Sequence, residues 1–357
     1  MRTVCFFGIY DPEYSRNRVL RRGFLENGFD VVDCRVDPRR FTGFRKYLRL
    51  LETYRKLENK RFDHVIVAFP GQTVVWLARM LFGKRIILDA FVSLYDSNVN
   101  DRALYSGRSL KGMRDYMLDF WACRMADVVL LDTQAHISFF CAKFRLPASK
   151  FRRVIVGTDD QIFHPTASLK PVTDASLETR PFLIHFHGRF IPLQGIEHIL
   201  DAASILNSEN IRFQIIGTGQ LHAEMMRRAA EMSLRNIRFI PDIPLADLPA
   251  YIAPADACLG IFGSTEKASR VIPNKVFECI AMGKAVITRD SPAIREVFTD
   301  SKNIVLCTAS SGQAIAQAIR EIRDDAPRRA SIAENAAGLS RSLFIPRGIV
   351  RRLIDQL

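Results

Sequence analysis

Apolar runs of strand length alternate with segments of helical periodicity along most of this chain. In the first half, the predicted strands cover residues 3–8, 30–36, 64–69, 85–90, 127–132 and 153–156. Predicted helices cover residues 16–27, 41–62, 73–82 and 115–125. Residues 96–114 are polar and lack strong periodicity, so we expect a loop that orders with a ligand. Alternation of strands and helices indicates a parallel sheet with helical crossovers.

A second alternating series follows the first. It runs from residue 182 to about residue 306, and an Ala-rich helical segment at 311–339 and a short basic amphipathic helix at 346–357 complete the chain. Residues 166–180 are polar with prolines nearby, which is typical of a linker. A chain of 357 residues can hold two domains with cores of their own. We therefore expect an α/β protein with domains at 1–170 and 171–340 and a terminal segment at 341–357.

Residues 271–296 carry the most informative pattern, a helix, a buried strand and a second helix in succession. Pro273 suits a first helical turn because its missing N–H would have no partner there, and Gly283 ends the helix. Residues 285–288 are apolar and partly β-branched like a buried parallel strand, and residues 290–292 open the next helix. Polar groups therefore gather where the sheet meets the helix starts.

Four of these polar groups predict a ligand site. Helix N-termini attract anions and open α/β sheets bind ligands outside the carboxyl ends of their strands, so Asn274 and Lys275 are placed for a phosphate. Glu278 lies one turn further in, where a buried carboxylate needs donors such as sugar hydroxyls, and Glu296 arrives from the following helix. Taken singly, Lys275 and Glu278 are more typical of a solvated helix face. The combination favours a site.

Residues 273–288 read Pro-Asn-Lys-Val-Phe-Glu-Cys-Ile-Ala-Met-Gly-Lys-Ala-Val-Ile-Thr, and Arg-Glu follows at 295–296. This stretch resembles the donor-binding segment of glycosyltransferase family 4. That family is part of the glycosyl transferases group 1 and has the GT-B fold. Other segments resemble the family in the same order along the chain. They are the strand and Gly-Arg loop at 182–195, the strand and Gly-x-Gly at 214–220, and the segments at 237–248, 255–259, 126–132 and 153–165. The resemblance spans nearly the whole chain.

The resemblance implies two Rossmann-like, doubly wound domains that face a central cleft, the first for an acceptor and the second for a nucleotide-sugar donor. It also implies a terminal helix that crosses back to the first domain. It assigns Arg189 to the diphosphate as a catalytic cation, Glu278 to the ribose and the Ile243 region to the base. The donor-binding residues expected from it are Arg189, Gln194, Gly217, Ile243, Arg270, Asn274, Lys275, Glu278 and Glu296.

The activity implied by the resemblance is hexosyl transfer with retention of anomeric configuration. The donor is a nucleotide-diphosphate sugar, and the acceptor is a glycan or a lipid-linked molecule in cell-envelope or polysaccharide assembly. No metal or other cofactor is expected, because Arg, Lys and backbone N–H groups can neutralise the diphosphate. A nicotinamide enzyme that reads residues 217–219 as its dinucleotide loop is a weaker alternative, since no third Gly follows.

Two positions depart from the family pattern. Five residues after its Arg the family usually has Lys, where this chain has Gln194. The position of a first family Glu, which is associated with the donor sugar, holds Arg270. These departures leave the donor sugar open and support an alternative, a catalytically inactive GT-B relative that acts as a binding or accessory protein. Our hypothesis is that Arg270 and Lys275 restore the positive charge missing at Gln194.

The first predicted strand leads into a polar segment at residues 8–18. By the same strand-end rule, it faces the ligand. The predicted acceptor-binding residues are Tyr10, Arg16, Asn17 and Arg18. A compatible alternative is a plain helix start, with Ser15 as N-cap and solvated arginines.

Asp89, at the end of the predicted strand 85–90, is the candidate catalytic carboxylate, which would orient the acceptor or act as a base. A loop cap is an equal alternative for it. His185 and His187 stand two residues apart on a predicted strand and so share one face. For each histidine, a hydrogen-bonded structural role is the favoured interpretation.

Composition and charge narrow the class of protein. With 48% hydrophobic and 25% charged residues the chain is of ordinary soluble composition, without an apolar run long enough to span a membrane, so we expect a cytoplasmic protein. The seven cysteines are widely spaced and lack metal-binding spacing, which is typical of buried thiols. Residues 1–170 hold 29 Lys and Arg against 18 Asp and Glu, whereas the remainder holds 22 against 20.

This one-sided charge favours an anionic partner. Nucleic acid is disfavoured because the basic residues contain no recognisable binding motif. Residues 41–62 combine seven cations and two anions with an apolar stripe, so this helix could lie on the inner face of an anionic membrane. The stripe consists of Phe44, Tyr47, Leu48, Leu51 and Tyr54. An ordinary core-facing helix with a basic solvent side is the alternative.

Overall fold

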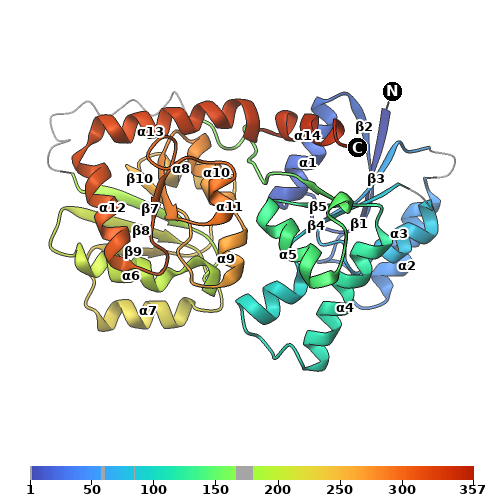
Figure 1. Ribbon diagram of the computed structural model, residues 1–357, viewed down its shortest axis with the longest axis horizontal. Helices are drawn as coiled ribbons and strands as arrows, with labels where there is room; N and C mark the ends of the chain where they lie inside the picture. The colour runs from blue at the N-terminus through green and yellow to red at the C-terminus, as the bar shows by residue number, and fades with distance from the viewer. Residues whose placement is uncertain (1, 58–60, 84, 166–179) are drawn as a thin grey trace. The chain divides into compact units, whose positions relative to one another are not determined.

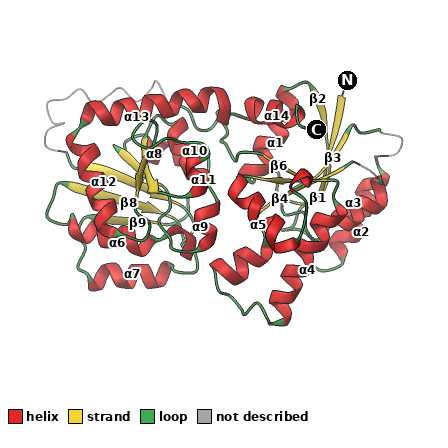
Figure 2. Ribbon diagram, viewed as in Figure 1, coloured by secondary structure: helices red, strands yellow, loops and turns green. Residues whose placement is uncertain are grey.

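The computed structural model describes residues 2–57, 61–83, 85–165 and 180–357. The chain forms two compact units, one of Met1–Gly157 with Leu343–Leu357 and one of Thr158–Ser342. Each unit contains a parallel sheet with helices (Figure 2). Apart from Arg180, the predicted linker lies outside the described residues, as does the predicted domain boundary at 170.

The first unit contains six parallel strands in the order β2-β1-β3-β4-β5-β6. They are β1 (Arg2–Ile9), β2 (Phe29–Val36), β3 (His64–Val67), β4 (Ile86–Phe91), β5 (Val128–Leu131) and β6 (Phe151–Arg153). Its helices are α1 (Ser15–Glu26), α2 (Arg45–Arg55), α3 (Val75–Phe82), α4 (Leu110–Met125), α5 (Gln134–Phe144) and α14 (Pro346–Ile354). The predicted alternation of strands and helices is confirmed. Strand β6 begins two residues earlier than predicted, because Phe151 is buried and pairs with Val129, and α2 is shorter than the predicted helix at 41–62.

Both faces of this first sheet are buried, which explains why its strands are continuously apolar. On β1, Cys5 and Phe7 face a core formed with α2, α3, α4 and α5, whereas Val4 and Phe6 face a core formed with α1 and α14. The terminal helix α14 packs against α1 (Figure 1). At Gly23 of α1, a Cβ atom would lie 2.3 Å from Val350, so glycine permits this close approach.

The structure supports the core-facing alternative for α2 and corrects the expectation for the polar segment before α4. Tyr47, Leu51 and Tyr54 pack against the core, so most of the α2 stripe is internal and only Phe44 and Leu48 remain exposed. Residues 96–114 are not simply a loop. Residues Asp96–Asp101 form a π-helical turn and Ser109 caps α4 five residues earlier than predicted.

Carboxylates of α4 hold the segment that precedes it. Asp119 accepts hydrogen bonds from the Ser93 hydroxyl and from the N–H groups of Leu94 and Tyr95. Asp115 accepts from the amide of Asn98 at 2.8 Å. Internal hydrogen bonds therefore order this segment, in place of the expected ligand.

The second unit contains six parallel strands in the order β12-β11-β10-β7-β8-β9. They are β7 (Phe182–His187), β8 (Ile211–Ile216), β9 (Ile237–Ile240), β10 (Ala257–Leu259), β11 (Ala285–Arg289) and β12 (Val305–Cys307). The helices are α6 (Ile196–Ile205), α7 (His222–Glu231), α8 (Leu248–Ile252), α9 (Glu266–Arg270), α10 (Asn274–Ala281), α11 (Pro292–Arg295), α12 (Gly312–Asp324) and α13 (Ala326–Leu339). The helix, strand and helix predicted within 271–296 are confirmed as α10, β11 and α11.

Side chains alternate along β7 between an apolar core and a polar cluster. Ile184 and Phe186 join the core formed with α6, α7, α12 and α13. His185 and His187 share the opposite face, as the pattern predicted. Pro273 stands one residue before α10 as its N-cap, and Gly283 follows its end with a positive φ of 70°. The polar cluster therefore lies where β7 meets α10.

Candidate functional site

The loops that follow β7 and β8 contact each other at the carboxyl edge of the second sheet. Gly188 N–H donates to Ile216 O at 2.9 Å, and Phe190 N–H donates to Thr218 O at 2.9 Å. A Cβ atom on Gly217 would lie only 2.0 Å from Gly188 O, at a φ of 135°. Glycine is therefore required for this contact, which leaves Arg189 exposed on the loop.

A chain of four side chains runs from β8 through β7 to α10. The Gln214 amide donates to His185 Nδ1 at 3.0 Å and to Tyr251 O at 3.1 Å. His185 Nε2 lies 2.9 Å from His187 Nδ1, and His187 Nε2 lies 2.8 Å from Glu278 Oε2. We call Gln214, His185, His187 and Glu278 the histidine relay.

The relay fixes which ring nitrogens carry protons. Because the Gln214 amide donates to His185 Nδ1, His185 must donate from Nε2 to His187 Nδ1, and His187 in turn donates from Nε2 to Glu278. Burial, together with the nearby Lys275, lowers the pKa of His187 to about 3, and burial also lowers the pKa of His185 well below its ordinary value. Both imidazoles are therefore neutral, and all donors point towards Glu278.

Lys275 lies beside the relay, on the first turn of α10. Its ammonium group donates to Gln194 Oε1 and lies 3.5 Å from the centre of the Phe186 ring. It also lies beside the loop that follows β7, residues 188–190, which we call the glycine loop, and is 2.8 Å from the place where a Cβ atom on Gly188 would be. Burial lowers the pKa of Lys275 well below its ordinary value. An anion at this position would favour the protonated ammonium group.

The structure brings Gln194, Lys275 and Glu278 together with the glycine loop, which carries Arg189, and with Gly217 of the loop that follows β8. Asn274, half-buried, begins α10 next to Lys275. The remaining predicted donor residues lie on other segments of the second unit. Ile243 follows β9, Arg270 ends α9 with its guanidinium 3.2 Å from Glu266, and Glu296 follows α11. Their donor-binding roles stay predictions.

In the first unit, the predicted catalytic carboxylate is bound by a predicted acceptor residue. Arg16 donates from Nε and Nη2 to both oxygens of Asp89, at 2.9–3.1 Å, and from Nη1 to Val154 O at 2.8 Å. The side chains of Arg16 and Asp89 are both 0% exposed. Burial raises the pKa of Asp89, and Arg16 opposes that shift. The expectation of solvated arginines was therefore wrong for Arg16.

The other predicted acceptor residues also make internal hydrogen bonds. The Tyr10 hydroxyl donates to Asp33 at 2.6 Å, and the Asn17 amide donates to Phe69 O at 2.8 Å. Arg18 donates to Glu13 O at 2.7 Å. Ser15 is not the N-cap, because α1 begins at Ser15 itself. No acceptor contact follows from these positions, so the acceptor roles stay predictions.

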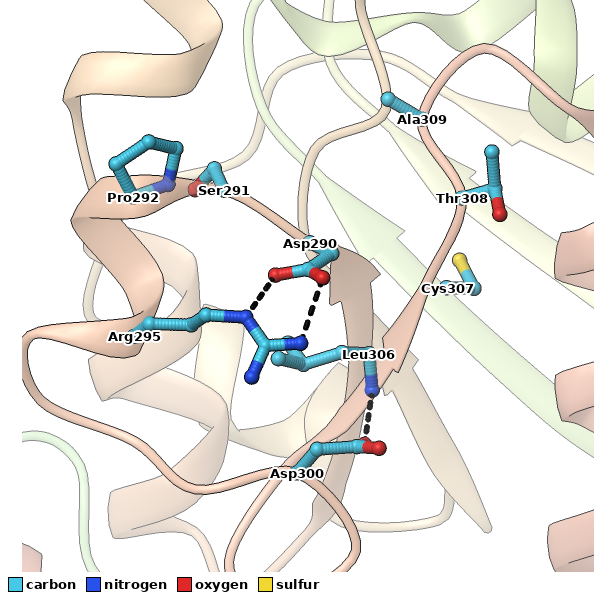
Figure 3. Close-up of a pocket in the computed structure, with 9 residues that line it drawn as sticks. All are labelled: Asp290, Ser291, Pro292, Arg295, Asp300, Leu306, Cys307, Thr308 and Ala309. Atoms are coloured by element: carbon cyan, nitrogen blue, oxygen red, sulfur yellow. Dashed lines mark hydrogen bonds and ion pairs between the residues drawn. The ribbon is translucent and has the colours of Figure 1, made fainter.

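A separate cavity of about 700 Å³ lies at the carboxyl ends of β11 and β12 (Figure 3). Arg295 reaches across it to both oxygens of Asp290, at 2.6 and 2.7 Å, and Asp300 accepts from Leu306 N–H at 2.8 Å. Its two carboxylates outnumber its one cation, which is already paired. A diphosphate is therefore better matched by Lys275 and the glycine loop than by this cavity.

Neither a metal-binding cluster nor a membrane-spanning helix is present in the part of the chain that the structure describes. Within residues 2–57, 61–83, 85–165 and 180–357, no group of three or more His, Cys, Asp or Glu side chains is arranged to hold a metal ion. In the same part of the chain, no helix is both long and apolar enough to cross a bilayer.

The sequence prediction missed the relay as a unit. Gln214 was not a candidate at all, although the register pairs it directly with His185. Polar residues opposite each other on two otherwise apolar strands were the available signal. Tyr251 contributes only its backbone carbonyl, which no side-chain pattern reveals.

Residues 173–338, just under half of the chain, match the family model described as glycosyl transferases group 1. A putative colanic acid biosynthesis glycosyl transferase, WcaI of Escherichia coli K12, is 27% identical over 182 residues, which are 46% of this chain and 44% of that protein. An alpha-D-kanosaminyltransferase of Streptomyces kanamyceticus is 22% identical over 224 residues, 61% of this chain and 56% of that one. The chain thus spans about half the length of the curated relatives it matches.

Solved structures establish the fold. The crystal structure of HepE from Anabaena, in complex with UDP and glucose, superposes with a TM-score of 0.75 at 14% identity, covering 99% of each chain. With two parallel six-stranded sheets and their helices, the chain has the predicted GT-B fold class. The resemblance to glycosyl transferases group 1 is likewise confirmed, while assignment to family 4 remains a prediction.

Proposed function

We propose that this chain moves a sugar from a nucleotide-diphosphate sugar to a glycan or lipid-linked acceptor. The premise is the match of residues 173–338 to glycosyl transferases group 1. The setting we propose is polysaccharide or cell-envelope assembly, in keeping with the similarity to WcaI, which is named a putative colanic acid biosynthesis glycosyl transferase. UDP is the first nucleotide to test, since HepE binds it.

One observation carries the proposal, the pairing of a buried lysine and a buried glutamate on the first turns of α10. Lys275 and Glu278 lie three residues apart beside the glycine loop, and each is held by a partner from a distant segment, Gln194 and His187. A cation at a helix start suits a diphosphate, and a carboxylate one turn away suits ribose hydroxyls. This arrangement supports donor binding.

The proposed reaction breaks the bond between the anomeric carbon and the diphosphate oxygen. The nucleoside diphosphate leaves with the bonding electrons, and an acceptor hydroxyl forms the new bond to the anomeric carbon and loses its proton. Stabilisation of the leaving diphosphate is the main requirement, which Arg189, Lys275 and backbone N–H groups would meet without a metal ion. We propose retention, so that an α-linked donor gives an α-linked product.

We also propose that the reaction takes place at a membrane surface. The excess of Lys and Arg in residues 1–170 favours contact with an anionic surface, so we propose a cytoplasmic enzyme attached peripherally to the inner face of the membrane.

A panel of sugar nucleotides tests the proposal. Purified protein is expected to release nucleoside diphosphate from at least one donor, and Glu278→Gln is expected to weaken that activity while Glu231→Gln, at an exposed end of α7, leaves it unchanged. Proton NMR of the product's anomeric signal reads out retention. Release of no nucleotide with any donor, in a folded protein, would reject transferase activity.

An inactive GT-B relative is the second candidate. It is favoured by Gln194 and Arg270, which replace a Lys and a Glu of the family pattern. Such a protein would be stabilised by a sugar nucleotide in thermal unfolding without releasing the diphosphate. Arg189 is unchanged from the pattern and exposed on the glycine loop, which supports the active enzyme.

A further inference from the structure

An apolar face crosses the outside of α3 and α4 in the first unit. On α4, Leu110, Met113, Met117 and Trp121 are exposed at spacings of three or four residues, so they form one stripe along the helix. On α3, Trp76 and Met80 form a parallel pair of exposed side chains. We call these six residues the α3–α4 face. Large apolar side chains normally avoid such continuous exposure, so the face is built to be covered.

A pocket of about 200 Å³ opens within this face. Its walls include Trp76 from α3 and Met117 and Trp121 from α4, with Val75 and Met125 among its other apolar residues. Gln72 and Arg114 are its polar lining residues, and the Gln72 amide is already directed to Val92 O at 2.8 Å. The pocket therefore offers an almost wholly apolar surface, which suits a hydrocarbon chain.

Two lysines lie near the α3–α4 face. Lys111 is exposed on α4, and the Tyr47 ring, which contacts Trp76 at 6.3 Å between centroids, brings α2 and its half-buried Lys46 alongside. Arg49 of α2 is paired with the exposed Glu52 at 2.6 Å, so these two charges offset each other. The carboxylates of α4 that lie nearby, Asp115 and Asp119, are buried and hold internal hydrogen bonds. Figure 1 shows α2, α3 and α4 on one side of the first sheet.

We propose that the α3–α4 face docks on an anionic lipid bilayer, with one hydrocarbon chain entering the pocket. Exposed tryptophans and flexible methionines between lysines match the boundary between acyl chains and anionic headgroups. Lysines are depleted in protein interfaces, so a protein partner fits this surface less well. The inference rests on the proposed function only for the lipid-linked acceptor, because docking itself needs no sugar donor.

Tryptophan fluorescence reports directly on this face, because the two tryptophans of the chain, Trp76 and Trp121, both lie on it. With vesicles of phosphatidylglycerol and phosphatidylcholine, tryptophan emission is expected to shift to shorter wavelength, and lipids brominated on their acyl chains are expected to quench it. Pure phosphatidylcholine is expected to give a much weaker response, and added salt to reduce binding. Unchanged emission with the anionic vesicles would overturn the proposal.

Two matched pairs of variants locate the contact. Met117 and Met226 are 42% and 41% exposed, on α4 and on α7 of the second unit. Met117→Glu is expected to weaken vesicle binding by about tenfold or more, as expected from loss of one buried apolar side chain, and Met226→Glu to leave it unchanged. Lys111→Glu and the exposed Lys302→Glu form the charge pair, with loss expected only for Lys111. Equal effects within either pair would place the contact elsewhere.

Further outcomes separate this proposal from its competitors. Emission that depends on protein concentration without lipid, accompanied by dimers in sedimentation, would assign the face to a second copy of the chain and overturn lipid docking. Met117→Glu is expected to retain diphosphate release from a soluble donor. If wild-type protein binds vesicles but processes no donor, the proposed function fails while lipid docking stands.

Discussion

His187 Nε2 lies 2.8 Å from Glu278 Oε2, although 91 residues separate them in the chain. The bond ties β7 to α10, and both side chains are nearly fully buried. Because His187 is itself oriented by His185, and His185 by Gln214, the position of Glu278 depends on a second strand. The relay thus supports a carboxylate that we assign to the donor.

His187→Leu is expected to reduce kcat/KM for the sugar nucleotide by about 10- to 100-fold, since a hydrogen bond to a charged group contributes about 1.5–3 kcal/mol. We expect the loss mainly in KM, because His187 positions a binding residue. His187→Gln is expected to recover part of it, because its amide can accept from His185 and donate to Glu278.

The exposed His164 provides the control, and His164→Leu is expected to behave as wild type. Steady-state kinetics of each variant measures KM and kcat/KM, and thermal unfolding shows whether the variant is folded. A His187→Leu protein with unaltered KM would show that Glu278 needs no support or does not bind the donor.

Acid is expected to destabilise the protein through the same histidines. The pKa of His187 is about 3 in the folded state against an ordinary 6.5, so between these values the unfolded chain binds a proton that the folded chain does not. The free energy of unfolding is therefore fully retained above about pH 6.5. Below that pH it falls by about 1.4 kcal/mol per pH unit for each such histidine.

Urea unfolding between pH 7 and pH 5 measures this slope. Since His185 shares the lowered pKa, wild type is expected to lose roughly 2–3 kcal/mol by about pH 5.5. His187→Leu should lose about 1 kcal/mol less over that range, whereas His164→Leu should follow wild type. Identical slopes for all three proteins would mean that His187 is protonated in the folded state.

Local patterns allowed much of the fold to be predicted. Helix α10 and strand β11 were predicted because helical spacing, Gly283 and a β-branched run all act within a few residues. The start of α4 was placed five residues late because the cap of Ser109 was not recognised in a polar stretch. Short-range physical signals thus suffice where they are strong.

The candidate site was predictable in its members more than in its contacts. Lys275 was expected on a helix start, but its bond to Gln194, 81 residues away, depends on how β7 and α10 pack. Asp89 lies within β4, two residues before its end, and the guanidinium that binds it comes from Arg16, 73 residues earlier. Tertiary packing decides such pairs, and a sequence pattern does not specify it.

Exchanging Gln194 and Lys275 tests whether the position of the ammonium group matters. Lys275→Gln is expected to weaken donor binding by about tenfold or more, because a cation that would face the phosphates is lost. Gln194→Lys is expected to destabilise the second unit by several kcal/mol, because two ammonium groups would share a buried space. The double variant Q194K/K275Q restores one ammonium and one amide.

The double variant is therefore expected to regain the stability of wild type to within about 1–2 kcal/mol and to bind the donor within about tenfold of it. Chemical unfolding and titration with the sugar nucleotide measure the two quantities. Donor binding by Lys275→Gln at wild-type strength would remove Lys275 from the phosphate site.

Arg270→Ala tests the hypothesis that Arg270 helps to replace the charge missing at Gln194. Loss of one partly screened cation near a diphosphate is expected to raise KM for the donor about 5- to 10-fold. Arg227→Ala is the control for loss of an Arg–Glu pair, because Arg227 pairs with Glu231 four residues away on a helix, at 66% exposure against 12% for Arg270. Donor kinetics that are the same for both variants and wild type would reject the hypothesis.

The Arg16–Asp89 pair distinguishes a structural carboxylate from a catalytic one. Asp89→Asn leaves Arg16 as a buried cation without its charged partner, which is expected to cost about 3–5 kcal/mol of stability. Replacing both residues by apolar ones, as R16M/D89L, removes that penalty, although Val154 O then loses the donor that Arg16 supplies. We therefore expect most of the stability to return.

Because both oxygens of Asp89 are bound by Arg16, we expect the double variant to keep transferase activity within about tenfold, measured as diphosphate release with acceptor. A stable double variant that hydrolyses or transfers no sugar would instead assign Asp89 to the chemistry.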